Sequence, residues 1–291
     1  MTRDRVVDWL VPVAPAERLA TLRLAVGAFT TVYLLIRAPI FLDLGDRPRS
    51  TFSPLGVWAW LDEPLPAGFV IGLFVVAVLS SIGSTVGVAY RVVGPLFGVS
   101  VLALLGYRSS WGQILWFEIP IVIFALIVGL APAAESRRLG RWRPPISPPS
   151  IRYGWPVQLA AMAIIATYVI AGIAKLRYGG IEWAAFEPMR NQIAFTAVRL
   201  EIFGEPSSPL VRPILDMPAL GSLAGVAVIA VELGAPLALL GGRLRTMWVA
   251  AVWLMHAFIA ATMFIVFPLP LFGVAFLPLF DLERWTRRNA N

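Results

Sequence analysis

Long apolar stretches alternate with short polar ones along almost the whole chain. A helix needs about 20 apolar residues to cross the hydrocarbon core of a bilayer, and fewer where neighbouring protein shelters it. By this measure the candidate spans cover about 19–41, 67–89, 93–107, 112–133, 154–176, 219–240, 246–267 and 269–282. The pattern predicts an all-α integral membrane protein, a bundle of about eight transmembrane helices forming a single domain over 1–291, without a separate soluble domain.

The composition agrees with a chain that meets lipid over much of its surface. Of the 291 residues, 58% are hydrophobic and only 14% are charged, whereas soluble domains carry roughly 25% charged residues. There is no cysteine, which excludes disulfides, thiolate nucleophiles and cysteine metal ligands. The net charge of +7 comes from basic residues between apolar spans, so we expect membrane lipids as partners and no nucleic acid.

Arginines in the connections predict how the spans are oriented. Clusters precede the first predicted span and follow the second, fourth, sixth and eighth: Arg3, Arg5, Arg18, Arg91, Arg137, Arg138, Arg141, Arg143, Arg152, Arg243, Arg245, Arg284, Arg287 and Arg288. With eight spans these clusters all fall on one side, which the positive-inside rule makes cytoplasmic. We therefore expect a multi-pass protein of the cell (plasma or inner) membrane with both termini in the cytoplasm. Residues 1–17 lack the apolar core of a cleavable signal, so the spans themselves are expected to direct insertion.

Two longer connections, about 42–66 and 177–218, fall on the opposite face. The second contains the stretch from Trp183 to Phe203, in which apolar residues recur at helical spacing: Ile193, Ala197, Leu200 and Phe203. We expect an extracytoplasmic amphipathic helix here, between spans five and six. It would lie in the membrane interface or form a lid over a cavity, and the sequence leaves both open.

Lys175 is the single lysine among 24 basic side chains. Arginine stays protonated in proteins, whereas lysine can lose its proton. Tyr168, Gly172 and Lys175 share one helical stripe at the extracytoplasmic end of the fifth span, where Gly172 permits close approach of a helix or a ligand. Burial there would favour the neutral amine that a general base requires. Alternatively, Lys175 anchors the helix end by extending to the polar interface.

His256, Glu232 and Glu118 are further ionisable residues inside predicted spans, and such residues are functional candidates by default. Antiparallel packing of spans six and seven predicts a contact between Glu232 and His256. Glu118 lies near the same side of the membrane as Lys175 and could pair with Lys175 or Arg177. His256 would carry a proton or donate a hydrogen bond to a ligand, or else join two helices. A single histidine without a carboxylate cluster predicts no metal site.

The lysine segment resembles a motif of a known family. The run Tyr168-Val-Ile-Ala-Gly-Ile-Ala-Lys175-Leu, with Trp183 shortly after it, is similar to the Tyr…Ala-Gly-x-x-Lys-Leu…Trp motif of the HTTM (horizontally transferred transmembrane) domain, the membrane domain of vitamin K-dependent gamma-carboxylase. Further residues agree in order and spacing: Glu232, Pro236, Arg243-Leu-Arg245, His256, Phe264 and Phe267, with Arg23-Leu-Ala-Val-Gly27 as a weaker block. The resemblance covers nearly the whole chain.

The resemblance implies a chemistry for these residues. In the carboxylase, the motif lysine deprotonates vitamin K hydroquinone, which reacts with oxygen to form an alkoxide that removes a proton from glutamate before carbon dioxide adds. Lys175 would then be the general base and a quinol of the menaquinol or vitamin K hydroquinone type the cofactor. The supporting residues would be His256, Glu232, Tyr168, Gly172, Glu118, Arg177 and Trp183. The stretch Ser109–Ile114 lacks a further histidine of the carboxylase, and no large soluble region follows the spans. Quinol oxidation or epoxidation is therefore expected ahead of glutamate carboxylation.

Two other hypotheses stay open. The chain could be a non-enzymatic partner, a maturation or export factor of a bacterial complex that acts with another membrane protein or a thioredoxin-like protein. Lys175 and Glu232 would then only brace helices. Transport would need a polar path through the bilayer, which Glu118, Glu232 and His256 could mark, but no inverted repeat is visible in the sequence.

Overall fold

The computed structural model describes residues 9–138, 148–185 and 187–283, and these ranges contain helices and no β-strand. The all-α architecture predicted from the apolar stretches is confirmed. The chain divides into two compact units, 1–161 with 280–291 and 162–279, and each unit is described by itself. Seven of the predicted cytoplasmic arginines lie outside the described residues: Arg3, Arg5, Arg141, Arg143, Arg284, Arg287 and Arg288.

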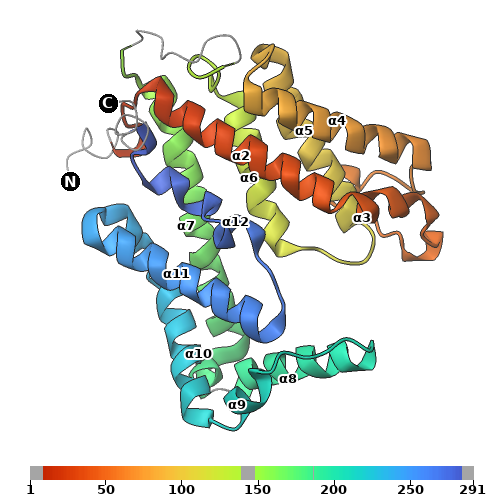
Figure 1. Ribbon diagram of the computed structural model, residues 1–291, viewed down its shortest axis with the longest axis vertical. Helices are drawn as coiled ribbons and strands as arrows, with labels where there is room; N and C mark the ends of the chain where they lie inside the picture. The colour runs from red at the N-terminus through yellow and green to blue at the C-terminus, as the bar shows by residue number, and fades with distance from the viewer. Residues whose placement is uncertain (1–8, 139–147, 186, 284–291) are drawn as a thin grey trace. The chain divides into compact units, whose positions relative to one another are not determined.

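The first unit is a bundle of helices with short connections (Figure 1). Its elements are α2 (Ala16–Ile36), α3 (Ala38–Leu42), η1 (Asp43–Asp46), η2 (Arg49–Thr51), η3 (Gly56–Trp58), α4 (Ala67–Val86), α5 (Tyr90–Ser109), η4 (Trp116–Glu118), α6 (Ile119–Leu130) and the start of α7 (Ile151–Gly179). Helix α2 packs on α4 and α6, and α5 packs on the same two helices. The four long apolar segments therefore form a closed ring of neighbours.

Small residues and hydroxyl groups bring the helices of this bundle close together. Gly94 on α5 and Gly129 on α6 face one another, and a Cβ atom added to Gly94 would lie only 2.5 Å from the Gly129 carbonyl oxygen. Ser80 and Ser100 share a hydrogen bond of 3.0 Å between α4 and α5. Such contacts are typical of helices in membranes. Lipid tails are as apolar as the side chains, so apolar burial alone does not favour a helix–helix contact over a helix–lipid contact.

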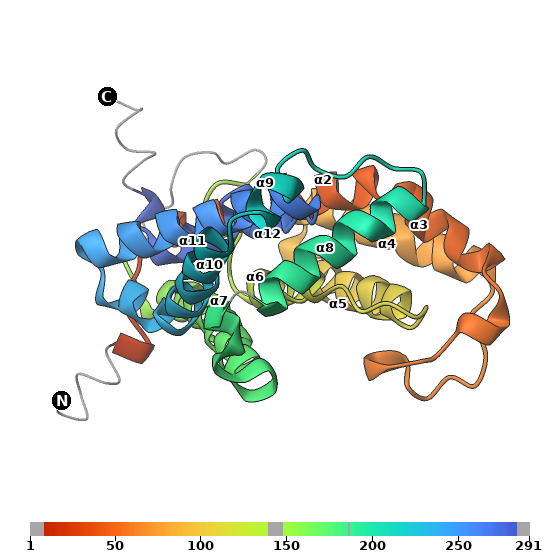
Figure 2. The same ribbon diagram turned by 90° about the horizontal axis from the view of Figure 1, so that it is seen from below.

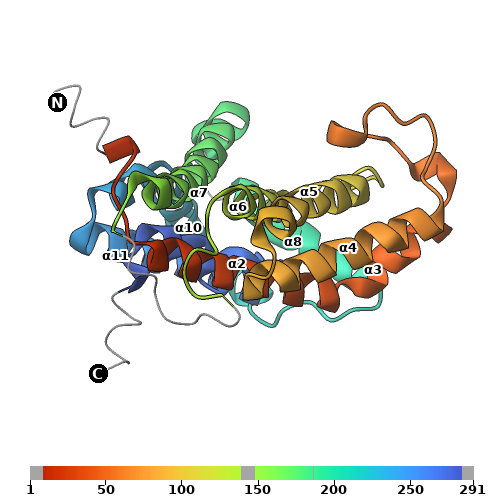
Figure 3. The ribbon, with the colours of Figure 1, turned by 90° about the horizontal axis from the view of Figure 1, so that it is seen from above.

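The segment between α3 and α4 folds back onto the end of α5 (Figure 3). The indole nitrogen of Trp58 donates to the Ala103 carbonyl oxygen at 2.7 Å, and the Leu65 amide donates to the Tyr107 hydroxyl at 3.0 Å. These bonds satisfy polar groups that would otherwise be left at the end of an apolar bundle.

A buried carboxylate joins three helices of the first unit. Glu118, 3% exposed, accepts a hydrogen bond from the Tyr33 hydroxyl of α2 at 2.5 Å, and its other oxygen lies 3.3 Å from Arg108 Nη1 of α5. The cation paired with Glu118 is thus Arg108, and the predicted pairing with Lys175 or Arg177 is wrong. Glu118 ends η4, directly before α6, and faces the bundle interior, where α2 and α5 supply the donors.

Replacing Tyr33 with phenylalanine is expected to lower the free energy of unfolding by about 1.5 kcal/mol, since it removes a hydrogen bond to a buried carboxylate while keeping the ring. Denaturant titration of the protein in mixed micelles measures this change. Tyr178→Phe is the matched control, because Tyr178 is 82% exposed and the same hydroxyl group is removed there. An equal loss in both variants would contradict a role for the buried bond.

The second unit contains shorter helices around the C-terminal part of α7 (Figures 1 and 2). They are η5 (Gly180–Ala185), α8 (Glu187–Ile202), α9 (Val211–Leu215), α10 (Pro218–Leu233), η6 (Ala235–Leu240), α11 (Gly242–Met263), α12 (Pro268–Leu271) and η7 (Val274–Leu279). Helix α9 connects α8 to the start of α10, and a small apolar core forms from Met189, Ile193, Ala197, Val211 and Ile214. This core fixes α8 against its neighbours.

Several helices are long and apolar enough to cross a membrane. In the described residues there are five, Ala16–Ile36, Ala67–Val86, Tyr90–Ser109, Ile151–Trp183 and Gly242–Met263, together with two shorter apolar helices, Trp116–Leu130 and Pro218–Leu233. These seven coincide with the first seven predicted spans. The eighth, 269–282, does not form a continuous helix: it is divided between α12 and η7, with Gly273 at φ 76° between them and Pro278 within η7. Proline lacks the amide donor of a helix interior and positive φ interrupts it, so a count of eight is not supported.

The stretch 183–203 also differs from the predicted amphipathic helix. It begins as the 3₁₀ helix η5 and continues as α8. One side of α8 is buried, through Met189, Ile193, Thr196 and Ala197, but the other side exposes Phe195, Val198 and Ile202. Apolar residues thus lie on both faces, so the structure supports a helix here without the predicted division into an apolar and a polar face.

Candidate functional site

Lys175 on α7 forms an ion pair with Glu232 on α10. The lysine nitrogen Nζ donates to Glu232 Oε1 at 2.7 Å, and the Lys175 side chain is 24% exposed whereas Glu232 as a whole is 5% exposed. Nζ also lies 5.5 Å from the centre of the Trp183 ring, within cation–π range. The lysine that the sequence singled out is therefore held between a carboxylate and an indole.

Gly172 allows α7 and α10 to approach at this point. It lies about one turn before Lys175, and a Cβ atom added there would be 2.9 Å from Leu233 Cδ2 and 3.1 Å from Glu232 Cβ. Because glycine has no side chain, the backbone of α7 fits against the residue that carries the carboxylate. The spacing of Gly172 and Lys175 along one stripe thus positions the ion pair.

A second polar pair joins α7 to α11. The Tyr168 hydroxyl lies 2.8 Å from His256 Nε2. Aromatic rings surround this pair: Trp248 meets the Tyr168 ring edge-on at 5.3 Å between centres, and Phe267 lies 4.8 Å from the His256 ring. The histidine is therefore held by a phenol and enclosed by apolar surface.

Two buried polar atoms in these pairs have no partner among the described residues. They are Glu232 Oε2 and His256 Nδ1, and both residues are 5% exposed. The predicted contact between Glu232 and His256 is thus wrong as a hydrogen bond, since one polar atom of each residue bonds to Lys175 or Tyr168 on α7 and the other has no partner in the described part of the chain. A buried polar atom without a partner costs free energy. Glu232 Oε2 and His256 Nδ1 are therefore available to bind the polar groups of a ligand.

The four side chains can bind a hydroxyl group and move its proton. When Tyr168 donates to Nε2, the imidazole carries its own proton on Nδ1 and can donate it to a ligand oxygen. Glu232 Oε2 is an acceptor beside the lysine cation. Lys175 is thus not isolated but paired with a carboxylate, so a base that included Lys175 would involve Glu232 as well. In the described ranges, no three metal-ligating side chains gather in one place.

Of the remaining predicted site residues, Trp183 lies beside Lys175, whereas Arg177 and Glu118 have other partners. Trp183 contacts Lys175, as described above, whereas Arg177 is exposed and its guanidinium lies over the Tyr178 ring at 5.6 Å. Glu118 belongs to the Tyr33 and Arg108 network of the first unit. Sequence reasoning missed Trp248, although Trp248, Val252 and His256 are spaced by four residues and all three are buried on α11. That stripe is the signal that could have found it.

Comparison with known families supplies one match. The family model described as the HTTM domain matches residues 48–285. No curated protein and no solved structure shows a significant match to the chain. All four residues of the two polar pairs fall inside the matched range.

Proposed function

The chain belongs to the HTTM domain family, and on that premise we propose that it binds a quinol-type lipid and removes a proton from it with the Lys175–Glu232 pair. The family and the apolar helices make it a multi-pass membrane protein related to the gamma-carboxylase. The observation that carries the proposal is the pair of unpartnered buried atoms, Glu232 Oε2 and His256 Nδ1. The two hydroxyl groups of a quinol can each donate and accept a hydrogen bond, so they match an acceptor and a donor of this kind.

Each residue has a defined task in this proposal. When bound, the quinol would supply an acidic hydroxyl and reducing equivalents. Lys175 passes a proton to Glu232 Oε1 across their 2.7 Å contact, and the neutral amine then accepts the hydroxyl proton, so that the quinol anion is left beside the re-formed ammonium. Tyr168 holds His256 so that Nδ1 can orient a ligand oxygen. Oxygen-dependent oxidation or epoxidation would follow, with coupled carboxylation as a further possibility that the resemblance implies.

The arrangement in the membrane is part of the proposal. Eight crossings require α12 and η7 to complete the last one, and only an even number places both termini in the cytoplasm. In the first unit the start of α5, the loop after α6 and the start of α7 carry Arg91, Arg138 and Arg152, respectively, at one end of the bundle. That clustering supports a cytoplasmic location for this end, in a bacterial inner membrane, by the positive-inside rule.

A second candidate function has its own support. An ion pair that joins α7 to α10 at 2.7 Å is also what a purely structural lysine would form. In that case the protein acts without catalysis, as a maturation or export factor beside another membrane protein or a thioredoxin-like protein. The activity of Lys175 variants distinguishes the two functions.

The test offers menaquinol or vitamin K hydroquinone to the purified protein in nanodiscs under oxygen and measures quinol consumption by absorbance. Wild type is expected to turn over, and Lys175→Ala and Lys175→Arg are expected to lose at least about 100-fold in rate, since general-base assistance contributes roughly that much. Arginine keeps the charge but cannot exchange the proton. Arg177→Ala is the matched control, because it removes an exposed cation two residues away.

Circular dichroism and thermal unfolding verify that each variant stays folded. A wild type without turnover, or a Lys175→Ala variant that keeps it, would contradict the enzyme hypothesis and favour the partner function. Loss in Arg177→Ala as large as in Lys175→Ala would show that positive charge at this end of α7, rather than the base, is what matters.

A further inference from the structure

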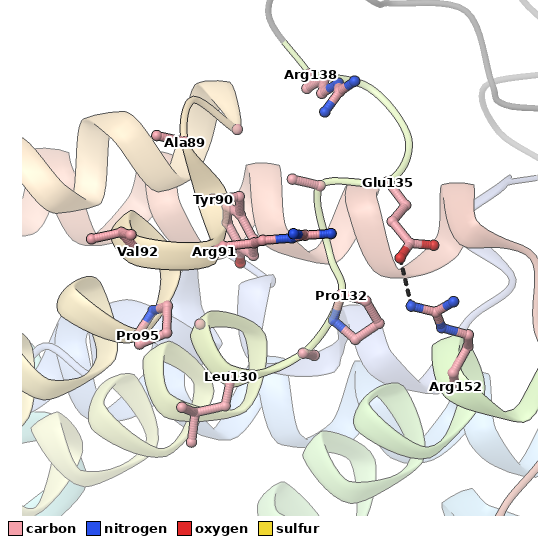
Figure 4. A pocket seen from close by; sticks show the side chains of 14 residues that line it. Ala89, Tyr90, Arg91, Val92, Pro95, Leu130, Pro132, Glu135, Arg138 and Arg152 are labelled. Atoms are coloured by element: carbon pink, nitrogen blue, oxygen red, sulfur yellow. Dashed lines mark hydrogen bonds and ion pairs between the residues drawn. The ribbon is translucent and has the colours of Figure 1, made fainter.

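A pocket of about 1040 Å³ lies at one end of the first unit (Figure 4), and none of the four residues of the two polar pairs lines it. The turn between α4 and α5, the start of α5, the end of α6, the loop that follows it and the start of α7 line this pocket. Nothing in the proposed quinol chemistry uses it. Its lining combines arginine side chains, the N-terminus of α5 and apolar side chains, and this combination indicates which kind of ligand fits.

Three arginines line the pocket, and they differ in their partners. Arg152 pairs with Glu135 at 2.5 Å, and Glu135 also accepts a hydrogen bond from Tyr153. Arg91 and Arg138, in contrast, form no salt bridge with a carboxylate in the described parts of the chain. In Figure 4 the Arg91 side chain extends toward the loop that carries Glu135 and Arg138. Two cations are therefore left available at the pocket.

A fourth arginine lies directly beneath these lining residues. Arg23 is 0% exposed, and its guanidinium donates to the Ser84 carbonyl oxygen at 3.2 Å and to that of Arg137. A Cβ atom added to Gly87 in the pocket lining would lie 2.1 Å from Arg23 Nη1. No carboxylate among the described residues forms an ion pair with Arg23, and its Nε has no partner there. A buried cation without a counter-charge is costly and favours an anion nearby.

The backbone adds positive potential at the same place. Helix α5 begins at Tyr90, which lines the pocket, after Ala89 with the left-handed φ of 43°. The amides of Val92 and Val93 donate to the Ala89 carbonyl oxygen, whereas the amides of Tyr90 and Arg91 precede these bonds at the helix N-terminus. A helix N-terminus carries a partial positive charge and binds phosphate well.

Apolar residues on the same wall decide which anion fits. Val92 and Leu130 are 69% and 64% exposed, and Pro95 and Pro132 line the pocket beside them. A free phosphate makes no use of such surface, whereas an acyl chain does. We propose that this pocket binds an anionic phospholipid, with its phosphate at Arg91 and Arg138 above the buried Arg23 and an acyl chain along Val92 and Leu130. The arginine-rich end of a membrane bundle is where acidic headgroups are recognised.

The experiment measures lipid binding to the full-length, delipidated protein by native mass spectrometry. Phosphatidylglycerol and phosphatidylcholine are the two lipid probes, and inorganic phosphate is the third. Wild type is expected to retain phosphatidylglycerol preferentially, and the double variant Arg91→Gln and Arg138→Gln to lose at least about tenfold in affinity, since each arginine near lipid phosphate contributes about fivefold. Arg49→Gln is the matched control. Arg49 is an exposed arginine in η2, which precedes the N-terminus of α4, whereas the pocket follows the C-terminus of α4.

Each other outcome overturns the proposal. Displacement of phosphatidylglycerol by millimolar inorganic phosphate would show a site for free anions rather than lipid. Equal retention of both lipids would remove the role of the headgroup charge. A loss in Arg49→Gln as large as in the double variant would indicate diffuse attraction by net charge instead of a site.

Discussion

Replacing Glu232 with leucine is expected to lower the free energy of unfolding by about 3 kcal/mol, because it leaves the Lys175 ammonium without its carboxylate. We expect the lower end of the range for broken buried ion pairs, since the Lys175 side chain is 24% exposed and water reaches part of it. The double variant Lys175→Met with Glu232→Leu is expected to recover most of the loss. Denaturant titration in mixed micelles measures wild type, the single variants Glu232→Leu and Lys175→Met, and the double variant.

The double variant gives the sharper result because it removes both charges together. If its loss equals the sum of the two single losses, the side chains are not coupled and the 2.7 Å contact does not form. The control is Glu187→Leu in the same unit, whose carboxylate lies 3.6 Å from Arg190 with both side chains more than half exposed. That change is expected to cost less than about 0.5 kcal/mol.

Gly94→Val is expected to destabilise the first unit by about 3 kcal/mol or more, with Gly94→Ala intermediate. A Cβ atom at Gly94 would lie 2.5 Å from the Gly129 carbonyl oxygen, and one at Gly129 would lie 2.4 Å from that of Gly94. Both obstacles are backbone atoms, so relief requires α5 and α6 to separate and lose their packing. The same micelle titration measures the change.

Gly106→Ala provides the control on the same helix. A Cβ atom there would meet Val57 Cγ2 at 3.5 Å, an ordinary contact, so we expect a change within about 1 kcal/mol, and alanine also favours helix over glycine. Similar losses at Gly94 and Gly106 would show that the helix tolerates neither substitution for reasons other than the α5–α6 contact. A neutral Gly94→Ala would mean that the two helices do not approach as described.

Helix identity could be predicted from the sequence because it depends on local apolar length. Each of the first seven predicted spans coincides with an apolar helix, although α6 is shorter than the predicted 112–133. The eighth does not form one helix, although its apolar composition is sufficient, because Pro268, Pro270 and Pro278 lack the amide donors that a continuous helix needs. The pattern Gly94-x-x-x-Gly98 is likewise visible in the sequence, but the sequence does not show that Gly94 packs against Gly129.

The sequence by itself determined the all-α membrane class, the family and the stripe that aligns Tyr168, Gly172 and Lys175, because these depend on composition, motif and the period of one helix. Only the tertiary structure decided the partners. It paired Lys175 with Glu232 and Tyr168 with His256, where the sequence predicted Glu232 with His256, and it placed Arg23 beneath a pocket. Partners across helices depend on how each helix is rotated about its axis, which side-chain packing sets and which no single apolar run encodes.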